Sequence, residues 1–364
     1  MAGMRMTTRR FPLRPAATLA WGTGAFAGIQ LVLAVGLLTW WPQMRDPWYG
    51  EKLRQLRRRI AAGLERPCVV MLGSSRTLNA FNAGLVEWRL AAAGGPPATV
   101  YNFGLPGASS LAELVMLGRL LADGVRPEVL LVEVSPTFMT RPPDFGMFPA
   151  HRIWKREVPL LAAWLGQGEA LGAQWWHGRL VPCYTHREAI LYSICPKLLA
   201  KESYGPWFKQ FDPAGWERFD AQGFGPTFRH RALEHTRREL TRGLAEGRVS
   251  AVSRAALIQL VETCRHEGIR LVLVLPPVEA AFRSGDVLAA ESETDALLDR
   301  LHDDYGVAFV DARDWVVEEH FFDSYHVLDA GASAFSERLT RQVLVPQLRR
   351  FEVARRPPAT ATIR

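Results

Sequence analysis

Five short apolar runs alternate along the sequence with stretches whose apolar residues recur at helical spacing. The runs are Cys68–Gly73, Thr99–Phe103, Val129–Val134, Ile269–Leu275 and Val307–Asp311. Short apolar strands separated by amphipathic helices are typical of a parallel sheet covered by helices on both faces. We therefore predict an α/β fold with a central parallel sheet.

Three helices are predicted between or after these strands. One lies within residues 108–124 and closes at Gly124, and a second covers about Ala251–His266. The last begins at Asp329, an N-cap residue, and runs to about Leu344. The tail after Arg350 is expected to be disordered.

An uncharged apolar segment, Ala16–Trp41, lies near the N-terminus. It is longer than the about 20 residues that a helix needs to span a bilayer. Four arginines precede the segment and two tryptophans end it, as expected at membrane interfaces. A cleaved signal peptide is the alternative, but its apolar core would be about 7–15 residues long. We predict an uncleaved, single-pass membrane anchor.

Basic residues also follow the span, in the amphipathic segment 51–64, EKLRQLRRRIAAGL, which is suited to lying on anionic headgroups. The positive-inside rule therefore acts on both sides of the membrane. Our prediction places the N-terminus inside and the body outside the cytoplasm, in the periplasm.

The net charge of +7 comes from the N-terminal region. Residues 1–60 hold ten Lys and Arg against two Asp and Glu, whereas the remaining residues hold 34 basic and 35 acidic side chains. A body without net positive charge lacks the basic surface that binds a phosphate backbone. No nucleic-acid partner is predicted.

Residues 140–250 interrupt the alternation of strands and helices and are predicted to form a helical insertion. They contain half of the twelve tryptophans: Trp154, Trp164, Trp175, Trp176, Trp207 and Trp216. These side chains either form the insertion's own core, which we favour, or form a cap that stacks sugar rings or touches the membrane interface. The predicted organisation is a cytoplasmic tail and anchor (1–42), a basic linker helix (43–65), two halves of the core (66–139 and 251–350) on either side of the insertion (140–250), and a disordered tail (351–364).

The four cysteines show no metal-binding spacing such as C-x-x-C, and no metal or cofactor is predicted. Cys68 and Cys264 lie in apolar contexts and are expected in the core. Cys183 and Cys195 are twelve residues apart in an aromatic-rich region. A disulfide and two free thiols are equally consistent with that spacing.

Four polar stretches lie at the carboxyl ends of predicted strands or in the loops that follow. They are LGSSRT (72–77), YNFGLPGASS (101–110), LLVEVSPTF (130–138) and FFDSYHVLDAGASAF (321–335). The carboxyl ends of parallel strands share one edge of a sheet, and α/β proteins build their sites there. The four stretches are therefore expected to meet.

In this order, the four stretches resemble the SGNH, or GDSL-like, hydrolase superfamily. The resemblance covers about residues 66–139 and 251–348, and it implies a three-layer α/β fold with serine esterase or acyltransferase chemistry. The nucleophile position corresponds to Ser75, two residues after Gly73, and the terminal D-x-x-H motif corresponds to Asp323 and His326.

Two further features follow from the resemblance. The backbone N–H groups of Ser75 and Gly107 are expected to form an oxyanion hole. Ser74 replaces the family's usual aspartate, and this GSS form is similar to membrane-bound members that act in D-alanyl-lipoteichoic acid transfer and polysaccharide O-acetylation.

The residue types suit this chemistry independently of any family. A serine hydroxyl is a poor nucleophile until a base takes its proton, and a neutral histidine needs a carboxylate to fix its tautomer. Asp299 and His302 also have D-x-x-H spacing, but they lie within a predicted amphipathic helix and are interpreted as a solvated face.

The third stretch departs from the family because it lacks the asparagine that completes the oxyanion hole. Ser135 is the predicted substitute donor. Arg76 and Asn102 are predicted to contact substrate; for Arg76, orientation of the loop or a surface salt bridge are the alternatives.

The sequence thus leads to two functional hypotheses. The first is a membrane-anchored serine O-acyl esterase or acyltransferase whose substrate is an acylated carbohydrate or another ester of the envelope or exopolysaccharide. The second is a non-catalytic accessory protein of a membrane-bound O-acyltransferase or an export complex. The absent asparagine favours the second hypothesis, and the Ser75, Asp323 and His326 set favours the first.

Overall fold

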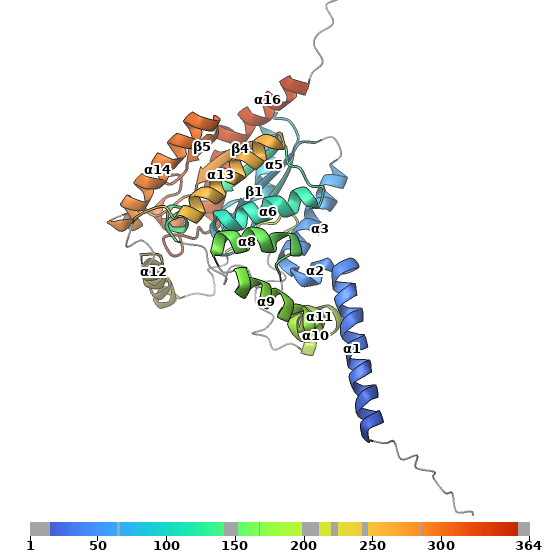
Figure 1. The fold of residues 1–364 in the computed structure, drawn as a ribbon. Helices are drawn as coiled ribbons and strands as arrows, with labels where there is room; N and C mark the ends of the chain where they lie inside the picture. The colour runs from blue at the N-terminus through green and yellow to red at the C-terminus, as the bar shows by residue number, and fades with distance from the viewer. Residues whose placement is uncertain are drawn as a thin grey trace, which may run out of the picture.

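The computed structural model describes residues 15–63, 66–141, 152–166, 168–198, 211–219, 225–241, 247–283 and 285–355. Its centre is one sheet of five parallel strands in the order β2-β1-β3-β4-β5 (Figure 1). The strands are β1 Cys68–Gly73, β2 Thr99–Gly104, β3 Val129–Glu133, β4 Arg270–Leu275 and β5 Ala308–Asp311. All five predicted runs form strands, and the predicted parallel sheet is confirmed.

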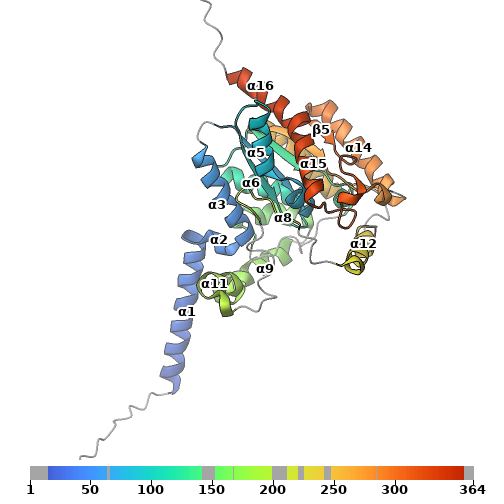
Figure 2. The same ribbon diagram turned by 180° about the vertical axis from the view of Figure 1, so that it is seen from behind.

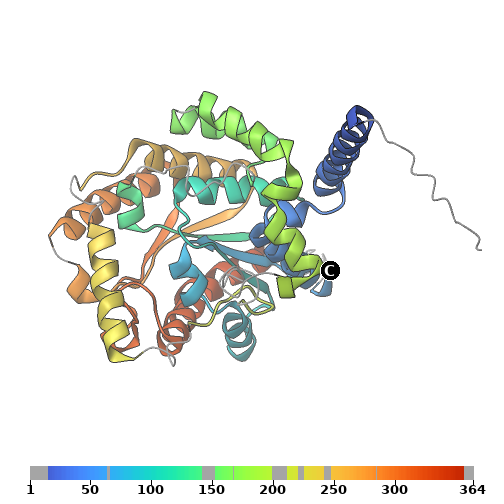
Figure 3. The same ribbon diagram turned by 90° about the horizontal axis from the view of Figure 1, so that it is seen from below.

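Helices cover both faces of the sheet, as Figures 2 and 3 show. One layer contains α6 Ser110–Ala122, α13 Ala251–His266 and α14 Asp286–Tyr305; the other contains α5 Ala83–Ala92, α15 Asp329–Leu339 and α16 Val345–Arg355. Successive side chains of β1 enter the two cores alternately, with Val70 and Leu72 on one face and Val69 and Met71 on the other. The predicted three-layer α/β fold is confirmed.

The C-terminal helix is longer than expected. After α15 the chain continues through a π-helical segment, Thr340–Leu344, into α16, which ends at Arg355. Residues 351–355, predicted to be disordered, are therefore helical; the rest of the predicted tail lies outside the described residues. Leu328 occupies the N-cap position, and Asp329 is the first helical residue.

The apolar N-terminal segment forms one helix, α1 Pro15–Thr39, which projects from the body (Figure 1). Its stretch Pro15–Leu37 is long and apolar enough to cross a membrane, and only 11% of its most apolar window is buried against the rest of the protein. Such an exposed apolar helix differs from the buried core helix of a soluble protein.

The basic segment after the anchor packs on the body. Following the short α2 Pro42–Arg45, helix α3 Pro47–Ala62 buries Leu53 and Leu56 in the core beside β2. Lys52 is also fully buried, and its Nζ donates hydrogen bonds to the carbonyl oxygens of Asn102 (2.9 Å) and Gly215 (2.8 Å). The apolar face of α3 is thus covered by protein, which corrects the expectation that this helix lies on headgroups.

The remaining helices are short or belong to the insertion. They are α4 Ser75–Ala80, α7 Pro136–Thr140, η2 Lys155–Glu157, α8 Val158–Leu165, α9 Gly168–Leu180, α10 Pro182–Thr185, α11 Arg187–Ile194, η3 Pro196–Leu198, α12 Pro226–Thr241, η5 Ala280–Phe282 and η6 Glu318–His320.

The described tryptophans of the insertion do not form a separate core. Trp175 belongs to the same buried cluster as the sheet residues, and Trp154 and Trp164 pack against that cluster. Trp216 packs against the core on the other face of the sheet. Our expectation of an independent core is wrong, because the insertion lies directly on the α/β body. Trp207 lies outside the described residues.

A buried ion-pair network fastens the insertion and the linker to the body. Arg119 of α6 donates to both carboxylate oxygens of Glu157, at 2.6 and 2.8 Å, and to Asp46, at 2.7 Å. Glu157 belongs to the insertion, and Asp46 is the N-cap residue of α3. Removing one partner of such a network would leave a buried charge unpaired.

All four cysteines are free thiols, and Cys68 and Cys264 are buried as expected. Cys183 and Cys195 are not bridged, and the amide of Gln30 in α1 contacts the Cys183 thiol and backbone.

Two adjacent tryptophans provide a test of how the insertion packs. Trp175 is 8% exposed and its Nε1 donates to the Ile153 carbonyl oxygen, whereas Trp176 is 62% exposed. We expect Trp175→Ala to lower the free energy of unfolding by about 3–5 kcal/mol. Trp176→Ala should change it by less than about 0.5 kcal/mol. Thermal or denaturant unfolding in detergent measures both, and equal effects would contradict the described packing.

Candidate active site

The polar stretches meet at the carboxyl edge of the sheet, beside β1 and β3. The strand order reverses between these two neighbours, and such a switch point leaves a crevice at the sheet edge. β1 ends at Gly73, Ser74 is the N-cap of α4 and accepts a hydrogen bond from the Arg76 N–H, and Ser75 is the first helical residue. The turn from strand to helix thereby presents Ser75 at this edge.

A buried carboxylate from β3 holds the turn in place. Glu133 accepts hydrogen bonds from the Ser74 N–H (2.9 Å) and hydroxyl (2.8 Å) and from the Thr77 N–H (3.2 Å) and hydroxyl (2.7 Å). A Cβ at Gly73 would lie 2.6 Å from a Glu133 oxygen and 2.1 Å from the Thr77 hydroxyl. Glycine is therefore required for the carboxylate to approach so closely.

Ser75, His326 and Asp323 form one chain of hydrogen bonds. The Ser75 Oγ lies 2.8 Å from His326 Nε2, and His326 Nδ1 lies 2.9 Å from Asp323 Oδ2. Burial opposes ionisation of Asp323, but hydrogen bonds from His326 and Thr236 lower its pKa below the usual value. An ionised carboxylate only accepts, so Nδ1 carries the imidazole proton and Nε2 is free to accept from the serine hydroxyl.

The loop that carries Asp323 and His326 is a small closed turn. Asp323 Oδ1 accepts from the His326 N–H (2.8 Å), and the Phe322 N–H donates to the His326 carbonyl oxygen (2.8 Å). Ser324 between them has a φ of 69°, an uncommon conformation for a residue other than glycine. Its backbone and hydroxyl are both hydrogen-bonded to Glu279, which stabilises this conformation.

The competing D-x-x-H pair lies elsewhere. Asp299 and His302 are in α14, and His302 Nδ1 lies 3.0 Å from the Val307 carbonyl oxygen, just before β5 begins. This is the amino edge of the sheet, opposite the edge that carries Ser75. The structure does not bring this pair to the site.

Arg76 is buried and holds loops together, in line with one of its predicted alternatives. Its guanidinium donates to Ser135 Oγ (3.1 Å) and to the Pro276 carbonyl oxygen (3.3 Å). It also lies over the Tyr325 ring, 3.9 Å from the centroid. The alternatives of substrate contact and of a surface salt bridge are not supported, because the side chain is only 3% exposed.

Asn102 and Ser135 also have internal roles. The Asn102 amide donates to the carbonyl oxygens of Thr77, inside α4, and of Phe81, which directly follows α4, and Asn102 is fully buried. The Ser135 hydroxyl accepts from Arg76 and lies within 3.1 Å of the Tyr325 hydroxyl. These placements do not support the predicted substrate contact of Asn102 or the predicted oxyanion donation by Ser135.

Gly107 lies in an exposed turn next to the serine loop. The Ala108 N–H donates to the Leu105 carbonyl oxygen, and Gly107 has a φ of 73° at the third position of this turn, which suits glycine. The Leu105 N–H in turn donates to the Gly73 carbonyl oxygen at 2.8 Å. The turn that holds Gly107 is therefore fastened to the end of β1.

The insertion contributes residues that the sequence did not predict. The Phe219 ring is nearly parallel to the His326 ring, with an interplanar angle of 12° and centroids 6.1 Å apart. Thr236 of α12 donates to Asp323 Oδ2 at 3.0 Å. Neither Phe219 nor Thr236 stands in a recognisable motif, so the sequence offers no signal for them. The role of Glu133 does have a sequence signal, because a glutamate at the end of an apolar strand indicates a buried carboxylate that needs hydrogen-bond donors.

Among the described residues, no group of three or more His, Cys, Asp or Glu side chains is arranged to hold a metal ion.

Comparisons with known proteins give only distant similarities. The sequence matches no protein-family model and no curated protein sequence. Among solved structures, a lipase/acylhydrolase from Enterococcus faecalis has a TM-score of 0.37 at 11% identity, covering 76% of this chain and 95% of the other. A carbohydrate acetylesterase family member from Sinorhizobium meliloti has a TM-score of 0.34 at 15% identity (78% and 99% covered). The M. smegmatis aryl esterase has a TM-score of 0.34 at 12% identity (76% and 98% covered). Similarities this low do not establish a family, so the functional argument rests on the site itself.

A matched pair of glutamates tests the serine turn. Glu133→Gln replaces an acceptor oxygen with a donor that faces other donors, so we expect a loss of about 1–3 kcal/mol in stability. We also expect slower reaction of Ser75 with a serine-directed fluorophosphonate. Glu128 accepts from the Cys68 N–H at the opposite end of β1. Glu128→Gln should leave the labelling rate unchanged, and equal labelling of the two variants would contradict the role of Glu133.

A second carboxyl group near the turn predicts a pH effect. Burial raises the pKa of Glu113 in α6 well above its usual 4.5, and the Glu133 charge adds to the shift. Below about pH 4 the Glu113 carboxyl is protonated in both the folded and the unfolded state. Above that pH it ionises in the unfolded chain before it ionises in the folded protein, so the free energy of unfolding falls as the pH rises. We expect Glu113→Gln to raise the melting temperature near pH 8 and to change it little near pH 4. An equal change at both pH values would contradict this prediction.

Proposed function

We propose that this protein is a membrane-anchored, serine-dependent O-acyl esterase or acyltransferase that acts on acylated envelope or exopolysaccharide through an acyl-serine intermediate. The observation that carries the proposal is the continuous hydrogen-bonded chain from Ser75 through His326 to Asp323. The GSS sequence and the N-terminal helix support placement among membrane-bound acyl-handling proteins.

In the first half-reaction, Ser75 Oγ attacks the carbonyl carbon of the ester while His326 Nε2 takes the hydroxyl proton. The tetrahedral intermediate then collapses, the bond to the alcohol oxygen breaks, and His326 returns the proton to that oxygen. Asp323 keeps the Nδ1 proton in place and stabilises the imidazolium. The acyl group remains on Ser75 as an ester.

The negative charge of the intermediate needs preorganised donors. The Ser75 N–H at the start of α4 has no partner within the described residues and is available for this role. We assign the second donor to the N–H of Gly107, whose turn is fastened to Gly73. Each such donor contributes about 3–4 kcal/mol in serine enzymes.

The second half-reaction decides between hydrolysis and transfer. Water or a sugar hydroxyl attacks the acyl carbon, His326 takes its proton, and Ser75 is released as an alcohol. Water produces a free acid, and a sugar hydroxyl produces a new ester. The part-buried Phe219 ring, which packs on the buried Phe322, lies beside His326 and suits an acyl chain or the apolar face of a sugar.

One observation favours the accessory hypothesis. The Ser135 hydroxyl is hydrogen-bonded within the protein, so it does not replace the oxyanion donor that the absent asparagine would supply. The ordered Ser75, His326 and Asp323 chain favours catalysis, because a scaffold does not require it. Reaction with a fluorophosphonate distinguishes the two, since only an activated serine is labelled.

We also propose that α1 is a retained single-pass anchor and that the body is extracytoplasmic. Most side chains of α1 are exposed, yet Gln30 and Leu37 are buried against the protein. A segment removed after export would not need such contacts. The anchor would hold the body at the membrane surface, near acylated envelope polymers.

Replacement of the three site residues tests the enzyme hypothesis. Ser75→Ala and His326→Ala should each reduce ester hydrolysis by more than about a thousandfold, and the double variant should be little worse, because the residues act as a unit. Asp323→Asn should reduce kcat while leaving the fold intact. The assay is hydrolysis of an aryl acetate by the full-length protein in detergent.

Two control variants accompany this test. Ser74→Ala loses contacts to Glu133 but keeps the nucleophile, so fluorophosphonate labelling should persist at a reduced rate. His302→Ala, on α14, should leave activity unchanged. Full labelling of Ser75→Ala together with loss in Ser74→Ala would place the nucleophile one residue earlier.

Carbonate extraction tests the anchor. The full-length protein should remain in the membrane pellet, and its intact mass should include residues 1–42. Deletion of residues 1–42 retains Asp46 and its ion pair with Arg119, so the body should fold, and a much smaller fraction of it than of the full-length protein should remain in the carbonate pellet. A purified full-length product that lacks its first forty or so residues would show a cleaved signal instead.

A further inference from the structure

One part of the insertion exposes an unusual number of large apolar side chains. We call helices α9, α10, α11 and η3, residues 168–198, the insertion hairpin. Five of its apolar side chains are 62 to 77% exposed: Trp176, Leu180, Tyr184, Ile194 and Leu198. So many exposed large apolar side chains within 31 residues indicate a surface that contacts lipid or another protein.

The insertion hairpin is attached to the candidate membrane helix. Gln30, the buried polar residue of α1, donates from its amide to the Cys183 thiol (3.0 Å), and its carbonyl accepts from the Cys183 N–H (3.1 Å). Figures 1 and 2 show α11 beside the upper half of α1. On the body side, Leu171 and Trp175 of α9 belong to the main core.

The position of Gln30 fixes the depth of α10. The apolar stretch of α1 runs from Pro15 to Leu37, and Gln30 lies inside it. At about 1.5 Å per residue, the rise from Gln30 to Leu37 is about 10 Å. If α1 crosses the bilayer with its apolar stretch in the hydrocarbon, α10 lies at a depth of about 10 Å, measured along α1 from the Leu37 end of that stretch.

The exposed charged side chains Glu169, Glu188 and Lys197 require parts of the insertion hairpin to lie at the level of the headgroups, whereas two of its arginines are held by its own backbone and by Ile153. Arg187 donates to the Tyr184 carbonyl oxygen (2.8 Å) and lies over the Tyr184 ring. Arg179 donates to the carbonyl oxygens of Trp175 and Ile153. Aromatic rings with partnered or outward-reaching arginines are typical of segments at the boundary between headgroups and acyl chains.

We propose that the insertion hairpin is embedded in the lipid layer beside α1, as a second and monotopic membrane contact of the body. The partner is a lipid surface, because the hydrogen bonds to Gln30 place α10 at hydrocarbon depth. The proposal rests on the anchor proposed above and does not depend on the chemistry of Ser75. Together, α1 and the insertion hairpin fix the orientation of the body toward the membrane.

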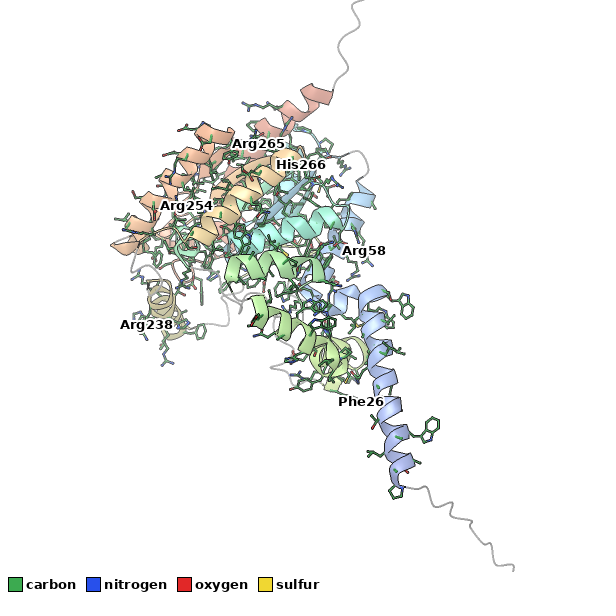
Figure 4. The ribbon with its side chains drawn as sticks, viewed as in Figure 1. Phe26, Arg58, Arg238, Arg254, Arg265 and His266 are labelled. Carbon is green, nitrogen blue, oxygen red and sulfur yellow. The ribbon has the colours of Figure 1, made fainter. Side chains whose placement is uncertain are left out.

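Photocrosslinking in the full-length protein tests this contact. The photoreactive residue p-benzoylphenylalanine replaces Tyr184 or Ile194, both exposed, in protein reconstituted in vesicles of phosphatidylethanolamine and phosphatidylglycerol and in native membranes. Phe26 of α1 is the positive control and Arg265 of α13 the negative control; Figure 4 shows both side chains pointing outward, at distant places on the molecule. Mass spectrometry identifies each adduct.

We expect phospholipid adducts at positions 184, 194 and 26, with yields at least about tenfold above position 265. Adducts at 26 without adducts at 184 and 194 would overturn the proposal while leaving the anchor intact. Adducts to another protein at 184 and 194 in native membranes would overturn it in favour of a protein partner. Absence of lipid adducts at position 26 would overturn the anchor and this proposal together.

A disulfide test examines the attachment to α1 separately. Gln30→Cys places a second thiol on the side of α1 that contacts α10, and oxidation with copper phenanthroline in membranes should join it to Cys183. This disulfide should be absent from the double variant that combines Gln30→Cys with Cys183→Ser. Failure of Gln30→Cys to join would overturn the depth assignment, since α10 would not then be held at Gln30.

Discussion

The site depends on one interaction, the capture of the β1–α4 turn by the Glu133 carboxylate. Four donors from Ser74 and Thr77 converge on a single buried acid at the end of the neighbouring strand. A carboxylate taken from water must receive such bonds to be tolerated, so the turn and the strand stabilise each other. As a result, the N–H and hydroxyl groups of Ser74 hold the turn, whereas the hydroxyl of the adjacent Ser75 faces His326.

Around this turn, loops that are distant in the sequence are fastened to one another. Arg76 reaches the loops after β3 and β4 and stacks on Tyr325, beside His326, while Asn102 ties the end of α4 to β2. The site is therefore held by buried polar contacts between loops. The catalytic side chains need such support, because displacing reacting groups by about 1 Å can lower the reaction rate by two orders of magnitude.

The insertion contacts the N-terminal helices as well as this site. Its hairpin contacts α1 at Gln30, Lys52 of the linker helix binds its segment 211–219 at Gly215, and the same segment places Phe219 on His326. α12 adds the bond from Thr236 to Asp323. None of these contacts follows from a sequence pattern, since each joins residues far apart in the chain.

The sequence by itself predicted the five strands of the sheet, the core helices α6, α13, α14 and α15, and the long apolar helix. These follow from local periodicity, and the shared edge of parallel strands predicted where the site would lie. The choice of Ser75, Asp323 and His326 came instead from the resemblance of four stretches to a known family. Only the tertiary structure decided the roles of Glu133, Arg76, Asn102 and Ser135, and it showed that the insertion's tryptophans join the main core. A polar residue next to a nucleophile has the same sequence signature whether it faces substrate or is buried. Its role is set by which donors and acceptors from other strands arrive beside it, and the chain acquires those neighbours only on folding.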